Sequence, residues 1–253
     1  MSSDGLSRRA LSLGLGAAFL APALARAEEK EKDKPPAPVN LVVFGDSLAD
    51  GLWGSYTRAY VRLRHIKVVR ATQNSSGFTA SNYEQELEKR LAAGKIDLLV
   101  MQVGANDRQR AFAPEGREWA VFQTPKWHEF YRQRIGRFLA LVQAKKINTV
   151  WVGLPIMRKE DARADAKMMN GIYREMSEQH GVPFVDIWAV TANAEGEYDA
   201  YREDEKGRKR RFRADDGIHF TEMGYDVVAR HVSKRVHELF PNVLPEIKPE
   251  KTE

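Results

Sequence analysis

Residues 39–52 read VNLVVFGDSLADGL, an apolar run that ends at Gly45 and is followed at once by Asp46 and Ser47. Its apolar part, residues 41–44, is the first of five such runs; the others are residues 66–69, 98–103, 149–154 and 183–188. The runs are short, rich in valine, leucine and isoleucine, and mostly continuous, which is typical of strands buried on both faces. The sequence therefore predicts five strands of one parallel sheet.

Longer segments with helical spacing separate these runs. Ser81 and Glu84 have the spacing of a capping box, Thr124 is followed by Pro125, and a last apolar stripe begins after Thr221. Each of these patterns is a helix start signal. Because strand and helix alternate throughout, we expect helices on both faces of the sheet, in an α/β fold of three-layer α/β/α type.

The two ends of the 253-residue chain differ in composition from its centre. Residues 1–27 contain two adjacent arginines, an apolar stretch and a closing Ala-Arg-Ala, the order of a secretory signal peptide. The apolar stretch is shorter than the roughly 20 residues that span a membrane. The paired arginines favour a twin-arginine signal, and an ordinary secretory signal is the alternative. We expect an exported protein, periplasmic or secreted, with no transmembrane segment after cleavage.

The remaining boundaries also follow from composition. Residues 28–39 are charged and proline-rich, as in a solvated linker, and residues 241–253 resemble them as a polar tail. Residues 40–240 contain no linker-like break and are predicted to form one domain.

Cysteine content and charge exclude several functions. The chain has no cysteine, which excludes disulfides, zinc-finger cysteines and a cysteine nucleophile. Its formal net charge of +5 falls to about +3 without residues 1–27. That balance is too weak to indicate a nucleic-acid partner.

Polar motifs follow the predicted strands. Gly45-Asp46-Ser47 follows the first strand, Gly77 closes an Asn-Ser-Ser-Gly segment after the second, and Asn106 follows the third. Because ligands of parallel sheets bind at the carboxyl ends of the strands, we expect these residues to lie close together. Near the C-terminus, Asp216-Gly217-Ile218-His219 precedes the last predicted helix.

The serine, histidine and aspartate of these motifs suit nucleophilic catalysis. A serine hydroxyl is a weak nucleophile until a base takes its proton, and a neutral imidazole is the natural base. His219 could therefore activate Ser47, and Asp216 could orient the imidazole through its other nitrogen. Asp215 is an alternative to Asp216, and Ser47 could instead cap a helix.

Together, the four motifs resemble those of the SGNH (GDSL-type) serine hydrolase superfamily over roughly residues 40–240. The resemblance implies a flavodoxin-like fold and assigns Ser47 as nucleophile, His219 as base and Asp216 as the residue that orients it. It assigns the oxyanion hole to the backbone N–H groups of Ser47 and Gly77 and the side-chain amide of Asn106. It implies no cofactor and no metal.

The function predicted from these residues is hydrolysis of an ester, with O-acetyl groups on cell-envelope polysaccharide as candidate substrates. An acyltransferase that uses the same triad and a non-catalytic envelope-binding protein are alternatives. A metallophosphoesterase is a weaker alternative, because Asp46 and Asp107 suggest metal ligands but only one histidine lies in a motif.

Two segments near the motifs are expected to shape the substrate pocket. Residues 112–123 are predicted to be a long loop, and residues 198–213 a β-hairpin rich in arginine. The arginines of both regions are candidates for a basic rim that attracts an anionic ester, and a solvated edge is the alternative. The candidate rim residues are Arg108, Arg110, Arg208, Arg210 and Arg211.

Overall fold

Five parallel strands form the central sheet of this computed structural model, which describes residues 37–204 and 206–248. They are β1 (Val39–Gly45), β2 (Ile66–Thr72), β3 (Leu98–Gln102), β6 (Thr149–Val152) and β7 (Phe184–Val185), in the order β2-β1-β3-β6-β7. Every neighbouring pair is parallel. The predicted parallel sheet is thus confirmed, whereas the predicted signal peptide, residues 1–27, lies outside the described residues.

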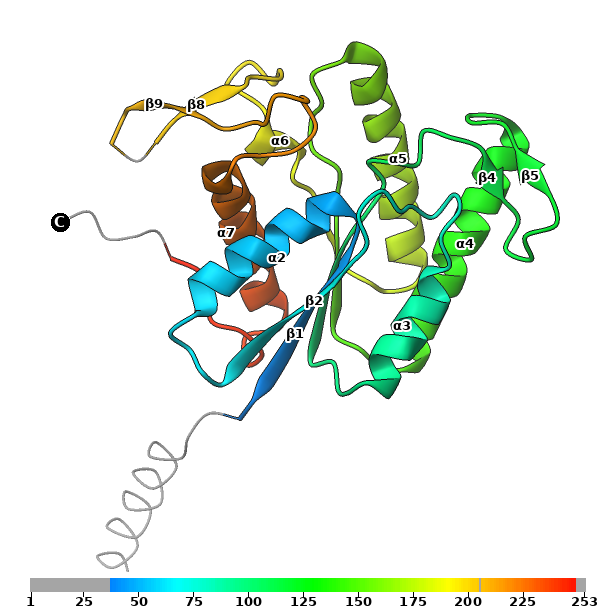
Figure 1. Ribbon diagram of the computed structural model, residues 1–253, viewed down its shortest axis with the longest axis horizontal. Helices are drawn as coiled ribbons and strands as arrows, with labels where there is room; N and C mark the ends of the chain where they lie inside the picture. Colours follow the sequence, from blue (N-terminus) through cyan, green and yellow to red (C-terminus); the bar gives the residue numbers. More distant parts are fainter. Residues whose placement is uncertain (1–36, 205, 249–253) are drawn as a thin grey trace, which may run out of the picture. The chain divides into compact units, whose positions relative to one another are not determined.

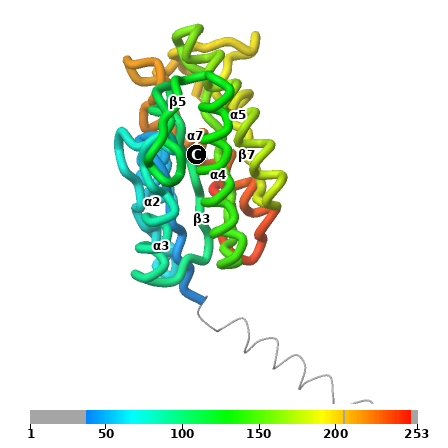
Figure 2. Tube along the Cα trace, turned by 90° about the vertical axis from the view of Figure 1, so that its right-hand side faces the viewer, coloured from blue at the N-terminus to red at the C-terminus, as the bar shows by residue number. Residues whose placement is uncertain are grey.

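Helices cover both faces of the sheet (Figure 1). Helices α2 (Ser47–Tyr60) and α7 (Glu222–Leu239) pack side by side on one face. Helices α3 (Tyr83–Ala92), α4 (Pro125–Ala144) and α5 (Glu160–Gln179) cover the other, with α4 between its two neighbours (Figure 2). The central strands are buried on both sides as expected: Leu41, Val42 and Val43 of β1 have no exposed surface, and every residue of β3 and β6 is buried. The edge strand β2 is mostly half-buried or exposed.

Two helices begin where the sequence predicts. The side chains of Thr124 and Thr221 each accept a backbone N–H at the start of α4 and α7. The predicted capping box at Ser81 is wrong, because Asn82 caps α3 by accepting from the N–H of Gln85. Ser81 is drawn into the preceding turn, where its N–H donates to the carbonyl of Gly77 at 2.8 Å.

The last strand is shorter than predicted. Residues 183–188 were expected to be extended, but only β7 (Phe184–Val185) pairs with the sheet. The carboxylate of Asp186 accepts the N–H of Trp188 at 2.8 Å, and the chain turns there into the short helix α6 (Trp188–Thr191).

Two antiparallel hairpins extend from opposite sides of this domain (Figure 1). The predicted loop 112–123 is partly ordered as a hairpin of β4 (Ala111–Phe112) and β5 (Trp119–Ala120), which packs on α4. The arginine-rich segment forms the expected hairpin, from β8 (Tyr201–Glu203) and β9 (Lys209–Arg211).

The packed domain extends beyond residue 240. Leu244 is buried, the hydroxyl of Tyr60 donates to the carbonyl of Pro245 at 2.8 Å, and the N–H of Ile247 donates to Ser233 at 2.9 Å. Residues 241–248 therefore belong to the domain rather than to a polar tail. Among the described helices, none is both long and apolar enough to cross a membrane.

Candidate active site

The structure brings Ser47, His219 and Asp216 together in one chain of hydrogen bonds. Ser47 is the first residue of α2, directly beyond β1, and its hydroxyl lies 2.7 Å from Nε2 of His219. Nδ1 of the same imidazole lies 2.6 Å from Oδ2 of Asp216. A base that contacts the nucleophile and is itself oriented by a carboxylate is the arrangement of a serine hydrolase triad.

Asp216 is held as an ionised acceptor. Its Oδ1 accepts the backbone N–H groups of Ile218 at 2.8 Å and His219 at 2.9 Å. Partial burial would raise the pKa of this carboxyl, but the hydrogen bonds from Ile218 and His219 outweigh it and lower the pKa to about 2. The alternative acid, Asp215, is exposed and is bound to Arg211.

The turn that presents Ser47 depends on Gly45 and Asp46. Gly45 has a φ of +140°, and a side chain there would overlap the carbonyl of Gln102. Asp46 caps α2, since its Oδ1 accepts the N–H of Leu48 at 2.9 Å. Ser47 therefore does not serve as the helix cap, and its hydroxyl is available to His219.

Asp46 also ties the nucleophile turn to the loop after β3. Its Oδ2 accepts the N–H groups of Gly104 at 2.9 Å and Ala105 at 3.1 Å. Burial raises the pKa of this carboxyl to about 6, although its three backbone hydrogen bonds act in the opposite direction. The carboxylate thus serves the backbone of two loops.

Asp107 likewise links the loop after β2 to the loop after β3. It is fully buried and accepts the N–H groups of Phe78 at 3.1 Å and Thr79 at 3.0 Å, and the hydroxyls of Thr79 at 2.8 Å and Tyr131 at 2.7 Å. A side chain at Gly77 would overlap this carboxylate. Position 77 therefore requires a glycine, because the Asp107 carboxylate comes so close to it. The sequence did not predict this role of Asp107.

The predicted oxyanion donors lie on the loops that these carboxylates hold. The side-chain amide of Asn106 donates one N–H to the carbonyl of Ser76 at 3.0 Å, which fixes the amide and leaves its second N–H. The N–H of Gly77 makes only a long contact of 3.4 Å with the hydroxyl of Ser81. Ser47 opens α2, so its N–H has no acceptor within the helix.

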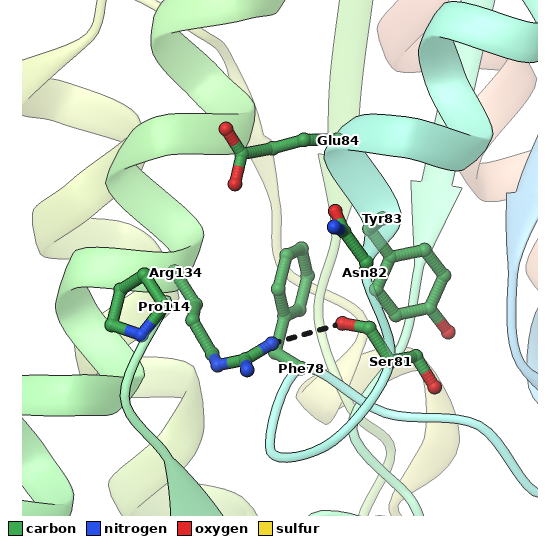
Figure 3. Close-up of a pocket in the computed structure, with 7 residues that line it drawn as sticks. All are labelled: Phe78, Ser81, Asn82, Tyr83, Glu84, Pro114 and Arg134. Carbon is green, nitrogen blue, oxygen red and sulfur yellow. Dashed lines mark hydrogen bonds between the residues drawn. The ribbon is translucent and has the colours of Figure 1, made fainter. Parts of the chain in front are cut away.

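Arg134, a residue of α4, supports the loop between β2 and α3 (Figure 3). Its guanidinium donates to the carbonyls of Ser81 at 3.1 Å, Phe112 at 2.6 Å and Ala113 at 3.1 Å. In the close-up it lies beside Pro114, where the side chains of α3 and the β4 segment meet around a small hollow. The start of α3 and the β4–β5 hairpin are thereby joined.

Arg213 supports the histidine loop and was also missed from the sequence. It has no exposed surface, and its guanidinium donates to the carbonyls of Ile156 at 2.7 Å, Ile218 at 2.8 Å and His219 at 3.3 Å. Burial lowers the pKa of this group to about 10. The run of arginines in the sequence gave no signal that this one points inward.

Arg108, predicted to belong to the basic rim, requires a correction. Its Nε lies 2.6 Å from Asp165 and its Nη2 lies 2.7 Å from Asp161, both on α5. Two carboxylates therefore occupy this guanidinium, and it links the Asn106 loop to α5.

The other candidate rim residues are mostly engaged as well. Arg208 binds Asp204 at 2.8 Å, and Arg211 binds Asp215. Arg110 lies over the exposed ring of Trp119, 4.7 Å from its centroid. Arg210 stands on β9, in register with Arg202. Two of the three hairpin arginines predicted for the rim are thus paired with nearby acids.

Comparison with known proteins gives the family. Residues 40–235 match the family described as "Protein of unknown function (DUF459)". The chain belongs to the DUF459 family. No curated protein matches the sequence.

Solved structures similar to this DUF459 chain include esterases and lipolytic proteins. A catalytic mutant of Axe2, an acetylxylan esterase from Geobacillus stearothermophilus, is 16% identical, with a TM-score of 0.55 over 79% of this chain and 95% of that one. A GDSL-like lipase from Bacteroides thetaiotaomicron is 14% identical, with a TM-score of 0.54 over 87% and 99%. A G-D-S-L family lipolytic protein from Veillonella parvula is 14% identical, with a TM-score of 0.52 over 80% and 98%. The DUF459 chain therefore has the SGNH/GDSL hydrolase fold, as its motifs implied.

Proposed function

We propose that this DUF459 protein is an exported serine esterase that uses Ser47, His219 and Asp216. The observation that carries the proposal is the continuous hydrogen-bond chain from the Ser47 hydroxyl through both nitrogens of His219 to Asp216. Residues 172 positions apart in the sequence meet there, on an edge of the sheet where ligands of this fold class bind.

In the proposed reaction, His219 takes the proton of Ser47 as its oxygen attacks the ester carbonyl. The tetrahedral intermediate collapses when the protonated imidazole gives its proton to the leaving alcohol. Water then attacks the acyl-serine by the same route in reverse, which releases the acid and restores Ser47. Asp216 stays ionised and stabilises the imidazolium at each stage.

The developing negative charge on the ester oxygen would be met by three donors. They are the N–H groups of Ser47 and Gly77 and the second amide N–H of Asn106, on loops that Asp46 and Asp107 hold in place. Donors fixed before the reaction need no reorganisation, and one such donor typically contributes about 3–4 kcal/mol to transition-state stabilisation.

For the substrate, we propose O-acetyl groups on a cell-envelope polysaccharide. The signal-like order of residues 1–27 supports export to that compartment. The acetylxylan esterase with the same fold shows that this scaffold accommodates an acetylated polysaccharide in another protein.

Turnover of nitrophenyl esters from acetate to palmitate tests this function. We expect a marked preference for acetate and loss of activity in Ser47→Ala. Ser55→Ala is a matched control, because Ser55 lies on the same helix but binds Asp226. Hydrolysis that survives in Ser47→Ala would refute the assigned nucleophile, and a preference for long chains would refute the polysaccharide substrate.

A further inference from the structure

Arg158 lies against the loop that carries Asp216 and His219. Its backbone N–H donates to the carbonyl of Gly217 at 3.1 Å. A Cβ on Gly217 would stand 2.5 Å from Cβ of Arg158 and 2.8 Å from its Nε, and Gly217 has a φ of +76°. A glycine at this position therefore lets the arginine side chain lie across the loop.

The turn that presents Arg158 is fixed by two other arginines. Arg213 donates to the carbonyl of Ile156 at 2.7 Å, and Nε of Arg163 donates to the carbonyl of Met157 at 3.1 Å. The carbonyls of the two residues before Arg158 are thus each held by a hydrogen bond from another arginine. Because the backbone is already fixed, ligand binding at Arg158 would not have to order this turn.

The guanidinium of Arg158 is left without a partner in the protein. It is exposed, and within residues 37–204 and 206–248 it makes no ion pair and no side-chain hydrogen bond. Three nearby acids bind other arginines instead: Asp161 binds Arg108, Glu197 binds Arg163 and Asp215 binds Arg211. A guanidinium with no ion pair or hydrogen bond to the described residues therefore lies beside the loop of Asp216 and His219.

We propose that Arg158 determines specificity by binding an anionic group, a carboxylate or a phosphate, next to the ester that is cleaved. The inference rests on the proposed esterase function and narrows its substrate class to esters of acidic sugars. A guanidinium presents paired N–H donors that match the oxygens of either anion. The charges that sequence reasoning assigned to the rim are mostly satisfied within the protein, whereas this one is not.

Kinetics with three acetylated sugars test the proposal: O-acetyl glucose, O-acetyl glucuronate and O-acetyl glucose 6-phosphate. We expect Arg158→Gln to raise KM about tenfold for the anion that the site accepts, as for the loss of one charged hydrogen bond near solvent. The kcat values and the KM for O-acetyl glucose should change by less than about twofold. Arg158→Lys should restore part of the affinity. Arg62→Gln, which removes an exposed arginine just beyond the C-terminal end of α2, should leave all of these KM and kcat values unchanged.

The response of the two anionic esters identifies the ligand. An effect on glucuronate alone indicates a carboxylate, an effect on the 6-phosphate alone indicates a phosphate, and an effect on both indicates a general anion site. An equal change for the neutral and both charged esters would show that Arg158 is only structural. No change with any ester would show that it does not contact the substrate. Either result overturns the proposal.

Binding separates this proposal from the proposed function. Calorimetry with Ser47→Ala and the same sugars requires no catalysis. If the wild-type protein hydrolyses none of the esters but Ser47→Ala binds an anionic sugar about tenfold more tightly than Ser47→Ala/Arg158→Gln, the esterase fails and the anion site stands. If hydrolysis occurs without this difference in affinity, the esterase stands and the anion site fails.

Discussion

Replacement of Arg213 by methionine tests whether a buried guanidinium holds the catalytic loop in place. Methionine fills much of the space of the arginine stem but has no N–H donor. The substitution would leave the carbonyls of Ile156 and Ile218 without their donor, whereas the carbonyl of His219 would keep the N–H of Ala214 at 2.9 Å. Because the segment from Ile218 to His219 carries the base, we expect the imidazole to lose its alignment with Ser47.

The expected loss of stability is modest. Leaving a buried acceptor unsatisfied costs about 1–3 kcal/mol, so the two short bonds, at 2.7 and 2.8 Å, contribute roughly 2–6 kcal/mol. Against this, burial lowers the pKa of Arg213 from its ordinary 12.5 to about 10, which corresponds to about 3 kcal/mol that a neutral side chain recovers. Adding the cation–π contact with Phe220, we expect a net destabilisation of about 2 kcal/mol.

We expect kcat to fall strongly although nearly all of the protein stays folded. Misplacement of a catalytic group by about 1 Å can reduce the rate about a hundredfold, so kcat of Arg213→Met for nitrophenyl acetate should drop by about that factor with little change in KM. A loss of about 2 kcal/mol from a domain stable by about 5–15 kcal/mol leaves nearly all molecules folded. Urea unfolding gives the stability, and Arg213→Lys should restore part of kcat. A kcat within twofold of wild type in Arg213→Met would refute the positioning role.

Three further results are expected. Asn106→Ala should lower kcat for nitrophenyl acetate by about a hundredfold or more, while loss of its hydrogen bond to Ser76 should lower the free energy of unfolding by only about 1 kcal/mol; an unchanged kcat would remove Asn106 from the oxyanion hole. Asp216→Asn should lower kcat by about 10⁴-fold, because the imidazole loses the carboxylate that orients it and stabilises its protonated form during the reaction. Since the folded pKa of Asp216 is lowered to about 2, its stabilisation is complete above about pH 4 and lost as the pH falls through 2, and acid titration of Asp216→Asn should lack that component. Truncation after Phe240 removes buried Leu244 and the hydrogen bonds that residues 244–247 make with Tyr60, Ser233 and His237. It should lower the free energy of unfolding by about 2–4 kcal/mol; an unchanged urea midpoint would show that the segment is dispensable.

The sheet could be predicted because its signal is local. Each strand is a short apolar run, and residues 41–44 and 98–103 are continuous because helices cover both of their faces. The positions of Ser47 and Asn106 follow from the same reasoning, since parallel strands bring their carboxyl ends to one edge. His219 precedes the last helix instead, and its place beside Ser47 was implied by the family resemblance. The residue that caps a helix is harder to predict. Ser81 and Asn82 could both cap α3, and Asn82 does so while the N–H of Ser81 binds the carbonyl of Gly77.

Partners of charged residues could not be predicted. Arg108, Arg158 and Arg213 look alike in the sequence, yet one binds two aspartates, one is unpaired among the described residues and one is buried against carbonyls. In the sequence Asp107 suggested a metal ligand; in the structure it accepts four hydrogen bonds in the interior. Such roles depend on contacts between segments that lie far apart in the chain.

The contact between Ser47 and His219 has a kinetic consequence. The turn at Ser47 needs only β1, α2 and the loop after β3, whereas its base comes from a residue 172 positions later. Closing so large a loop is entropically unfavourable, so contacts of this range generally form late. Recovery of ester hydrolysis after dilution from urea should therefore lag behind recovery of the far-ultraviolet circular dichroism signal. Activity of the proposed enzyme would then measure the last step of folding, in which His219 reaches Ser47.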